Sequence, residues 1–387
     1  MRRILACFLL LLFIPAAVLA QESINLSTPG YDGLSPYTLP DGRILFYGNA
    51  AAVGDYQDSR ARLLCLNADG TMAWEYVHPA EGRCSFSHPQ LLADGSIGVI
   101  FTNSPDQQIQ ELAICDFSQD GKLLAEPISI FIENLSVSGV TDTCVECVYM
   151  PGNEPVYEYR FLNWQGKPLF SFPSDQVIGG WHEMLPTAAG ILLAGKANGY
   201  PAPVVLVKMD LEGHIHWSRT LSSPLPDVDA DFDGLLPMAD GGFTAVLGEQ
   251  TYDPDSFLLP TKTEVFLVRY DQEGNILWKQ SFQQMGLIHV PVLDMIVYEP
   301  YIVVAIASDT PDGNEPFQYW FDAVTGEYAG RTSQLIPEGM TNLNSELVIL
   351  DSGLWLNQDL RKDIPDDRMA ALDSRDEWLV KVTDLER

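Results

Sequence analysis

Four alternating aspartates followed by a glycine give the clearest chemical signal in this chain. The segment runs Asp227-Val-Asp229-Ala-Asp231-Phe-Asp233-Gly234 and is followed by Asp240. Counted from Asp229, the carboxylates match the spacing of an EF-hand calcium loop, with aspartate at the last position, where that loop usually has glutamate. No flanking helices are expected. Two interpretations stay open, calcium held by Asp229, Asp231 and Asp233 or a solvated acidic loop between strands, and we favour the second.

The histidines form no recognisable catalytic group. His182 and Glu183 could act as a base and an acid, but neighbouring residues of a strand point to opposite faces, so each would need partners from elsewhere. The chain has no Gly-x-Ser-x-Gly elbow, no His-Glu-x-x-His and no phosphate-binding loop. We therefore predict no catalytic residues, although a site assembled from distant strands stays an alternative.

The cysteines are sparse for a chain of 387 residues. After Cys7, they are Cys65, Cys84, Cys115, Cys144 and Cys147. The spacing of Cys144 and Cys147 is that of a zinc ligand pair, but no second pair or nearby histidine pair completes a site, so we predict no metal. Residues three apart on a strand face opposite sides. We expect buried thiols, with one disulfide left open.

The first twenty residues have the pattern of a secretory signal peptide. Arg2 and Arg3 precede an unbroken apolar run that ends in small residues at Ala20. We expect cleavage before Gln21, and hence a secreted protein whose residues 21–387 form one domain. No later segment is long and apolar enough to span a membrane.

The chain is strongly acidic, with a formal net charge of −31. Without Arg2 and Arg3, 20 basic residues stand against 53 acidic ones, a net charge of −33. This disfavours nucleic acid and anionic membranes as partners, because both require cationic neutralisation. It is typical of a solubilising surface, with a cationic partner or bound divalent ions as alternatives.

One structural unit recurs along the chain. It is a short apolar strand, a turn centred on glycine, and a second strand with a large apolar residue four positions after the glycine. Clear copies end at Trp74, Trp217 and Trp278, and weaker copies centre on Gly121, Gly166 and Gly326. Further Asp-Gly hairpins lie upstream, at Gly42, Gly95 and Gly241. Repeats of about 40 to 50 residues indicate a β-propeller.

The markers predict an all-β fold, a seven-bladed β-propeller with four antiparallel strands in each blade. The approximate blade spans are 34–80, 82–131, 133–175, 176–224, 227–284, 286–335 and 337–387. The last blade lacks a fourth strand because Trp378–Val382 runs into the end of the chain. We predict that Ser23–Ser27 supplies this strand and closes the ring, which leaves no unpaired edge between the termini.

Strand order separates the two faces of such a ring. If strands are named A to D from the axis outward, the A–B and C–D turns share one face, here named the turn face, and all the tight Asp-Gly and Glu-Gly turns fall there. The B–C and D–A connections share the other, the loop face. We expect long irregular loops there, at residues 48–60, 102–110, 196–203, 248–263, 308–316 and 357–375.

The loop face is the predicted binding face, because function usually lies on loops held by a rigid scaffold. It is acidic and carries scattered aromatic residues, which suit cations or sugars. The candidate ligand-binding residues are Tyr56, Trp181, His182, Tyr200, Asp231 and Tyr252. Solvated loops with incidental aromatic residues are the alternative.

The repeats also resemble those of a known superfamily. The copies Val207–Trp217 and Phe321–Gly326 are similar to the repeats of pyrroloquinoline-quinone-type, WD-like β-propellers. The resemblance covers nearly the whole chain after Ala20 and is specific to the repeat. That superfamily includes quinone-dependent dehydrogenases, typically with eight blades and an adjacent cysteine pair over the cofactor. It also includes non-enzymatic relatives, such as the propeller lipoprotein of outer-membrane barrel assembly.

Seven predicted blades and no adjacent cysteine pair favour the non-enzymatic branch and imply no cofactor. We therefore predict an exported bacterial protein, monomeric and non-catalytic, that binds a protein, peptide or glycan on its loop face. The alternative is a secreted hydrolase or lyase acting on glycans, with inner-strand carboxylates and His182 at the channel mouth. Two carboxylates facing each other at glycosidase distances would favour the enzyme.

Overall fold

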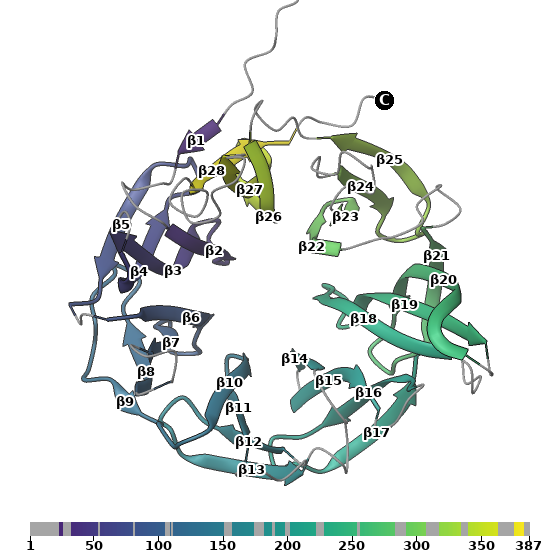
Figure 1. Cartoon of the computed structure of the whole chain (residues 1–387), viewed down its shortest axis with the longest axis horizontal. Coiled ribbons are helices and arrows are strands. Elements are labelled where there is room, and N and C mark those ends of the chain that lie inside the picture. Colours follow the sequence, from purple (N-terminus) through teal and green to yellow (C-terminus); the bar gives the residue numbers. More distant parts are fainter. Residues whose placement is uncertain are drawn as a thin grey trace, which may run out of the picture.

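A computed structural model describes residues 23–25, 32–52, 55–79, 82–104, 109, 111–150, 157–173, 182–187, 190–197, 202–221, 228–253, 256–282, 292–306, 317–333, 340–362 and 375–382. They form seven antiparallel sheets of four strands each, arranged as blades of one ring (Figure 1). The predicted seven-bladed propeller is confirmed. No helix in these residues is long and apolar enough to cross a membrane.

The first four blades follow one another along the chain. Blade one contains β2 (Asp32–Thr38), β3 (Ile44–Ala52), β4 (Asp55–Leu66) and β5 (Met72–Val77). Blade two contains β6 (Cys84–Leu91), β7 (Ile97–Asn103), β8 (Glu111–Phe117) and β9 (Ile128–Ser129). Blade three contains β10 (Leu135–Val140), β11 (Val145–Tyr149), β12 (Glu158–Leu162) and β13 (Pro168–Pro173). Blade four contains β14 (His182–Thr187), β15 (Gly190–Lys196), β16 (Val204–Met209) and β17 (Ile215–Thr220).

The remaining blades include the closure of the ring. Blade five contains β18 (Val228–Pro237), β19 (Phe243–Asp253), β20 (Ser256–Tyr270) and β21 (Ile276–Ser281). Blade six contains β22 (Val292–Tyr298), β23 (Tyr301–Ile306), β24 (Phe317–Asp322) and β25 (Tyr328–Ser333). Blade seven contains β26 (Met340–Leu350), β27 (Gly353–Lys362), β28 (Arg375–Lys381) and β1 (Ser23–Asn25).

β1 is the outer strand of blade seven, as predicted. Ser23 pairs with Val380 and Asn25 pairs with Trp378, so the first described strand lies against the last one. This pairing joins the first and last described strands within one sheet, which closes the ring (Figure 1).

The hydrophobic core is divided among the joints between blades. Successive side chains of a strand point to opposite faces, so each strand supplies two joints. Leu45 packs between blades one and two, whereas Ile44 and Phe46 pack between blades seven and one. Cys144 and Cys147 likewise belong to two different core clusters, as predicted from their spacing. The five described cysteines are buried, and burial raises the pKa of Cys147 to about 12.

The repeated glycine and the large apolar residue form a contact between blades. Gly121 has a φ of 80°, and a Cβ atom placed on it would lie 2.5 Å from Cε3 of Trp74 in the preceding blade. The other pairs with this arrangement are Phe170 on Gly213, Trp217 on Gly274 and Trp278 on Gly326. Glycine is therefore required for two reasons: its backbone is in the left-handed region, and the aromatic ring that covers it leaves no space for a Cβ atom. We name this contact the ring-on-glycine lock.

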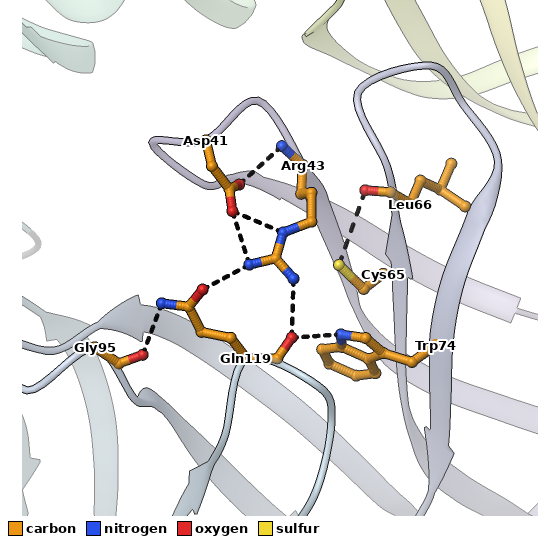
Figure 2. A network of polar contacts seen from close by, with 7 residues as sticks. All are labelled: Asp41, Arg43, Cys65, Leu66, Trp74, Gly95 and Gln119. Atoms are coloured by element: carbon orange, nitrogen blue, oxygen red, sulfur yellow. Dashed lines mark hydrogen bonds and ion pairs between the residues drawn. The ribbon is translucent and has the colours of Figure 1, made fainter.

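Polar groups reinforce the lock between blades one and two (Figure 2). The Arg43 guanidinium donates to Asp41 at 2.8 Å and to the Gln119 backbone and side-chain oxygens at 2.9 and 2.8 Å. The Trp74 indole N–H donates to the same Gln119 backbone oxygen at 2.9 Å. Gln119 in turn donates to the Gly95 carbonyl at 3.0 Å. The turn face of this joint is thus tied by side chains from both blades.

Two predicted loops of the loop face are not irregular. Residues 48–60 belong to the β3–β4 hairpin, which stays paired from Ile44 with Leu66 out to Ala52 with Asp55. Residues 248–263 belong to the β19–β20 hairpin, which stays paired out to Asp253 with Ser256. The prediction of irregular structure was wrong here, because the two strands of each hairpin stay paired almost to the hairpin tip. Residues 357–362 also lie in a strand, β27.

Candidate functional site

The candidate site is the loop face at blades four and five. Three predicted ligand-binding residues lie on strands of these two blades. His182 begins β14 and pairs with Gly195, Asp231 lies in β18 opposite Gly248, and Tyr252 lies near the end of β19. Tyr56 lies in β4 of blade one, on another part of the ring (Figure 1). Trp181 and Tyr200 lie outside the described residues.

The acidic segment that resembles a calcium loop is part of an inner strand. β18 includes residues 228–237, with a bulge between Phe232 and Leu235, so the expected loop at Asp229–Asp233 was wrong. Asp229 is buried, and its two oxygens accept from the Lys196 ammonium at 2.7 Å and the Ala202 amide at 2.9 Å. Both partners belong to blade four or its B–C connection. Asp229 therefore fixes blade five to the connection of its neighbour.

Metal ligation has no support at the described residues. They contain no group of three or more histidine, cysteine, aspartate or glutamate side chains that could hold an ion. Both oxygens of Asp229 are already used by Lys196 and Ala202. The calcium interpretation also needs Asp231 and Asp233, whose side chains the structure does not describe.

The β19–β20 hairpin rises from blade five on the loop face. β21 pairs with β20 only as far as Phe266, so the hairpin extends far past this outer strand, whereas β18 pairs with β19 as far as Thr251, close to the hairpin end. Near its end, the Tyr252 hydroxyl donates to the Gln250 side chain at 2.6 Å, and the Thr261 hydroxyl donates to the Thr251 carbonyl at 3.0 Å. Tyr252 is only 8% exposed, so most of its side chain is covered by the protein.

At the base of this hairpin, charge and an aromatic ring meet. The Lys279 ammonium lies 3.5 Å from the centre of the Phe266 ring and 3.8 Å from a carboxylate oxygen of Glu249. A cation over an aromatic face is attracted by the ring quadrupole. The three residues come from β19, β20 and β21, so this contact stabilises the position of the hairpin on its blade.

Inner-strand carboxylates lie close enough to influence one another. Asp294 of β22 accepts from its neighbour Met295 at 2.7 Å and from the Leu347 amide of β26 at 2.6 Å. Desolvation raises the pKa of Asp294 to about 6 against these hydrogen bonds, and Glu183 of β14 adds to the rise. Burial and the charge of Glu346 raise the pKa of Tyr47 to about 12. The raised pKa of Asp294 thus has burial as its main cause and the charge of Glu183 as a smaller one.

The turn-face carboxylates have the opposite character. Asp210 accepts from the amides of Glu212 and His214, and Asp322 accepts from the amides of Val324 and Thr325. These hydrogen bonds lower the pKa of both aspartates. The acidic residues of this face therefore close the turns, as side chains of aspartate commonly do.

Two structural features of the site were not predicted from the sequence. The Lys196–Asp229 ion pair links two blades, and its signal was a lone charge ending the apolar run Ile191–Gly195. The second feature is Asp294, whose signal was a carboxylate inside the apolar run 292–297. A charged side chain in a buried apolar strand needs an oppositely charged or hydrogen-bonding partner. This requirement could have identified both positions as structurally important.

The comparisons with known proteins identify the fold. No family model matches the chain, and a search of curated proteins finds no match either. The polysaccharide lyase Uly1 has a similar structure, with a TM-score of 0.51 and 10% identity over 93% of this chain and 91% of that one. A Bacteroides caccae protein of unknown function gives a TM-score of 0.37 at 16% identity, covering 65% of this chain and 83% of the other.

A third similar structure is the acylaminoacyl peptidase of Pyrococcus horikoshii, with a TM-score of 0.47 at 11% identity. The match covers 85% of this chain and 50% of the peptidase chain. Identities this low show shared architecture and do not transfer a function. The chain is thus a seven-bladed β-propeller whose distant structural neighbours include a polysaccharide lyase.

Proposed function

We propose that this protein is exported and acts as a non-catalytic scaffold that binds a peptide, protein or glycan on the loop face of blades four and five. The observation that carries the proposal is the β19–β20 hairpin, which extends on that face far past β21, the outer strand of its blade. Rigid projections on a closed scaffold suit recognition, because little conformational entropy is lost on binding.

Several contacts support a rigid binding surface. The Lys196–Asp229 ion pair and the Ala202 amide hold the neighbouring connection against β18. Lys279 and Phe266 fix the base of the hairpin. The formal net charge of −31 favours cationic ligands over anionic ones. Lysine-rich peptides and chitosan oligosaccharides are therefore the first probes.

Shortening the hairpin tests the proposal. Replacing residues 251–262 with Asn-Gly keeps Gln250 paired with Thr263 and ends the strands in a favoured two-residue turn. We expect the affinity for a peptide or glycan probe that the parent protein binds to fall by about tenfold or more, as measured by calorimetry. The matched control replaces residues 51–59 with Asn-Gly, which keeps Ala50 paired with Arg60 in blade one.

The control variant is expected to keep most of the affinity. Equal affinity in the blade-five variant and the parent protein would contradict the proposed site. Failure of the parent protein to bind any lysine-rich peptide or chitosan oligosaccharide would contradict the proposed ligand class. Both variants need unchanged far-ultraviolet circular dichroism, because blades share cores with their neighbours.

Export is tested separately with the amino-terminal segment. Fusing residues 1–30 to alkaline phosphatase, which is active only outside the reducing cytoplasm, should give activity. Amino-terminal sequencing of the exported protein should begin at Gln21. A charge placed in the apolar run, as in Leu10→Arg, should abolish activity. An inactive parent fusion would contradict export and leave the binding test unaffected.

A glycan-cleaving enzyme is the second candidate. The observation that favours it is Asp294 of the inner strand β22, whose pKa burial raises to about 6, with a smaller contribution from the charge of Glu183. The similar fold of a polysaccharide lyase agrees with this candidate. Incubation with a glycan panel and mass spectrometry of the products tests it. Products that disappear in Glu183→Gln would favour the enzyme, and a glycan that is bound but intact would favour the scaffold.

A further inference from the structure

A cavity of about 500 Å³ lies between blades two and three. Its lining comes from β9, from residues 130–132, from Leu135 and Cys147, and from β12, β13 and the turn between them. It is separate from the proposed loop-face site, which lies on blades four and five. Its volume falls within the range of small-molecule sites, about 300 to 1,000 Å³.

The cavity lies at a joint that lacks the ring-on-glycine lock. The residue four positions after Gly121 is Ala125, so blade two has no ring to place on Gly166. Ile128 and Ile130 approach Gly166 instead, with methyl carbons 3.2 and 3.3 Å from where its Cβ would be. Gly166 therefore borders the cavity, whereas the glycines of the lock lie beneath aromatic rings.

The floor of the cavity is apolar and contains no aromatic ring. Leu162 belongs to the core cluster shared with blade two, whereas Tyr159 and Phe161 belong to the cluster shared with blade four. Side chains alternate along a strand, so Glu158 and Arg160 share the face of Leu162. The residues of the blade-two cluster that line the cavity, here named the apolar floor, are Ile130, Leu135, Cys147 and Leu162.

The rim of the cavity is apolar and open to solvent. Phe131 and Ile132 line the cavity, and their side chains are 39% and 47% exposed. A ligand that enters the cavity would cover part of this surface and remove it from water, which favours binding.

One ion pair supplies the charged groups of the lining. Arg160 donates to Glu158 at 2.7 Å, and its guanidinium carbon lies 4.1 Å from the centre of the Tyr149 ring. The hydrogen bond from Arg160 lowers the pKa of Glu158 against a smaller effect of burial, and a hydrogen bond from Ser171 adds to the lowering. The carboxylate is therefore charged at neutral pH.

The ion pair leaves both donors and acceptors unused. A guanidinium carries five N–H groups, and among the described residues Arg160 makes one hydrogen bond, to Glu158. A carboxylate has about four lone-pair sites, of which Arg160 and Ser171 occupy two. The side chains of Arg160 and Glu158 are 30% and 34% exposed, so a ligand can reach both. Free donors and free acceptors therefore lie side by side above the apolar floor.

We propose that this cavity binds an uncharged aliphatic amide of medium chain length. Its chain lies on the apolar floor, its carbonyl oxygen accepts from Arg160, and its N–H donates to Glu158. A carboxamide has an acceptor and a donor in adjacent positions, which matches the adjacent donors and acceptors of the ion pair. Both hydrogen bonds involve an ionised partner, and such bonds are stronger than those between neutral groups.

Charged head groups fit the ion pair less well. An ammonium group could donate to Glu158, but it would lie beside the positive charge of Arg160 and leave the guanidinium donors unused. A carboxylate could accept from Arg160, but it would lie beside the negative charge of Glu158. The net charge of −31 also opposes an anion. Like charges at such short range oppose binding.

Three probes with the same eight-carbon chain test the proposal. They are octanamide, which is uncharged, octylamine, which is a cation at neutral pH, and octanoate, which is an anion. Binding is measured on the whole protein by calorimetry and by saturation-transfer NMR of the probe. We expect octanamide to bind about tenfold more tightly than either charged probe, which is the effect of one hydrogen bond to a charged group. Butanamide should bind at least about tenfold more weakly than octanamide, because each buried methylene contributes to affinity.

A first pair of variants locates the binding. Ser129 lines the cavity from an exposed position of β9, so Ser129→Trp should fill the opening and lower the octanamide affinity by about tenfold or more. Its control is Ser218→Trp, at an exposed position of β17 in blade four. The control should keep the affinity of the parent protein.

A second pair tests the head-group contact. Arg160→Met removes the donors and leaves Glu158 without its arginine, so octylamine should now bind about tenfold more tightly than octanamide. The control is Arg331→Met in blade six, which also removes one positive charge and an arginine beside an aromatic ring, that of Phe317. This control should keep the preference for octanamide.

Each result supports or overturns the proposal. Octanamide binding that is lost in Ser129→Trp and kept in Ser218→Trp supports the site. No octanamide binding at millimolar concentration, equal affinity in Ser129→Trp and the parent protein, or a charged probe that binds as tightly as octanamide would each overturn it. An unchanged preference in Arg160→Met would overturn the assigned head-group contact. If Arg160→Met fails to fold, the three probes and the serine variants still decide the outcome, because both serines are exposed.

Discussion

Two joints of the ring solve the same packing problem in different ways. Between blades five and six, Trp278 lies on Gly326, and a Cβ on that glycine would be 2.6 Å from the indole. Between blades two and three, only Ile128 and Ile130 approach the turn glycine, and a cavity lies beside it. The first joint is filled by one large ring from the preceding blade. The second joint is filled only in part, by the smaller side chains of Ile128 and Ile130, and a cavity remains.

The difference between the two joints indicates that the repeated residues serve the packing of neighbouring blades. The glycine and the large apolar residue are not two parts of one hairpin signal, because each apolar residue serves the glycine of the next blade. Where the next blade has no such turn, the ring is absent. The residue four positions after Gly326 is Gly330, and the blade that follows is completed by strands from both chain ends. The lock is therefore a joint between neighbours.

The largest expected effect is a methyl group at Gly326. Gly326→Ala forces a φ of 74° on an alanine and drives its Cβ into the Trp278 ring. Strain and overpacking together should lower the free energy of unfolding by about 4 kcal/mol. Gly166→Ala, which meets methyl groups at 3.2 and 3.3 Å, should cost about half as much. Urea denaturation measures both.

Gly95→Ala is the control for backbone strain alone. Its φ is 85°, but the nearest atom to the new Cβ would be 3.6 Å away. We expect a cost of about 1 to 2 kcal/mol. Equal losses at Gly326, Gly166 and Gly95 would show that the rings do not constrain the glycines.

Removing the ring should come next in size. Trp278→Ala deletes the indole and should cost about 3 kcal/mol, whereas Ile128→Ala, at a side chain 40% exposed, should cost about 1 kcal/mol. In the Trp278→Ala background, the penalty of Gly326→Ala should shrink by about 2 kcal/mol, because the overpacking is gone. Additive losses in this double-mutant cycle would contradict the contact.

At a third joint, between blades six and seven, the carboxylate of Asp294 accepts a hydrogen bond from the Leu347 amide of the next blade. Asp294 has a pKa of about 6 in the folded protein and an ordinary value of 3.8. Its contribution to stability is therefore full below pH 3.8 and is lost as the pH rises through 6. From pH 4 to pH 8, the stability of the parent protein relative to Asp294→Asn should fall by about 2 kcal/mol.

Asp322→Asn is the control, because hydrogen bonds lower the pKa of Asp322 and so reverse the sign. The parent protein should gain stability relative to this variant as the pH rises through the acidic range. Thermal melting at a series of pH values measures both differences. The same pH trend in the two variants would contradict the assignment of Asp294.

The smallest effect is expected from adding bulk at the cavity. Ser129→Val should raise the free energy of unfolding by about 0.5 to 1 kcal/mol, through strand propensity and partial filling of the opening. Ser218→Val gains the propensity term without a cavity and should give less. Identical melting temperatures for the two variants would mean that filling the cavity adds no stabilising contact.

The sequence predicted the blades well, because glycine turns and apolar strands are local signals. Ser23–Ser27 was assigned to blade seven by counting strands, and the pairing of Ser23–Asn25 with β28 confirms the assignment. The segments around Gly48 and Gly248 were misread as irregular, because their polar residues hid continued strand pairing. The Asp229 contacts and the cavity depend on which blade lies beside which, and a local pattern does not report that.

Pairing between β1 and β28 also has a consequence for the timing of folding. Ser23 pairs with Val380, so the first described strand finds its partner only after residue 380 has been synthesised. Contacts of such long sequence separation form late, because the loop that they close is entropically costly. A chain emerging from the ribosome can stack successive blades as they appear. The ring of blades stays open until β28 has been synthesised and can pair with β1. Truncation before Arg375 would remove β28 and leave the ring open.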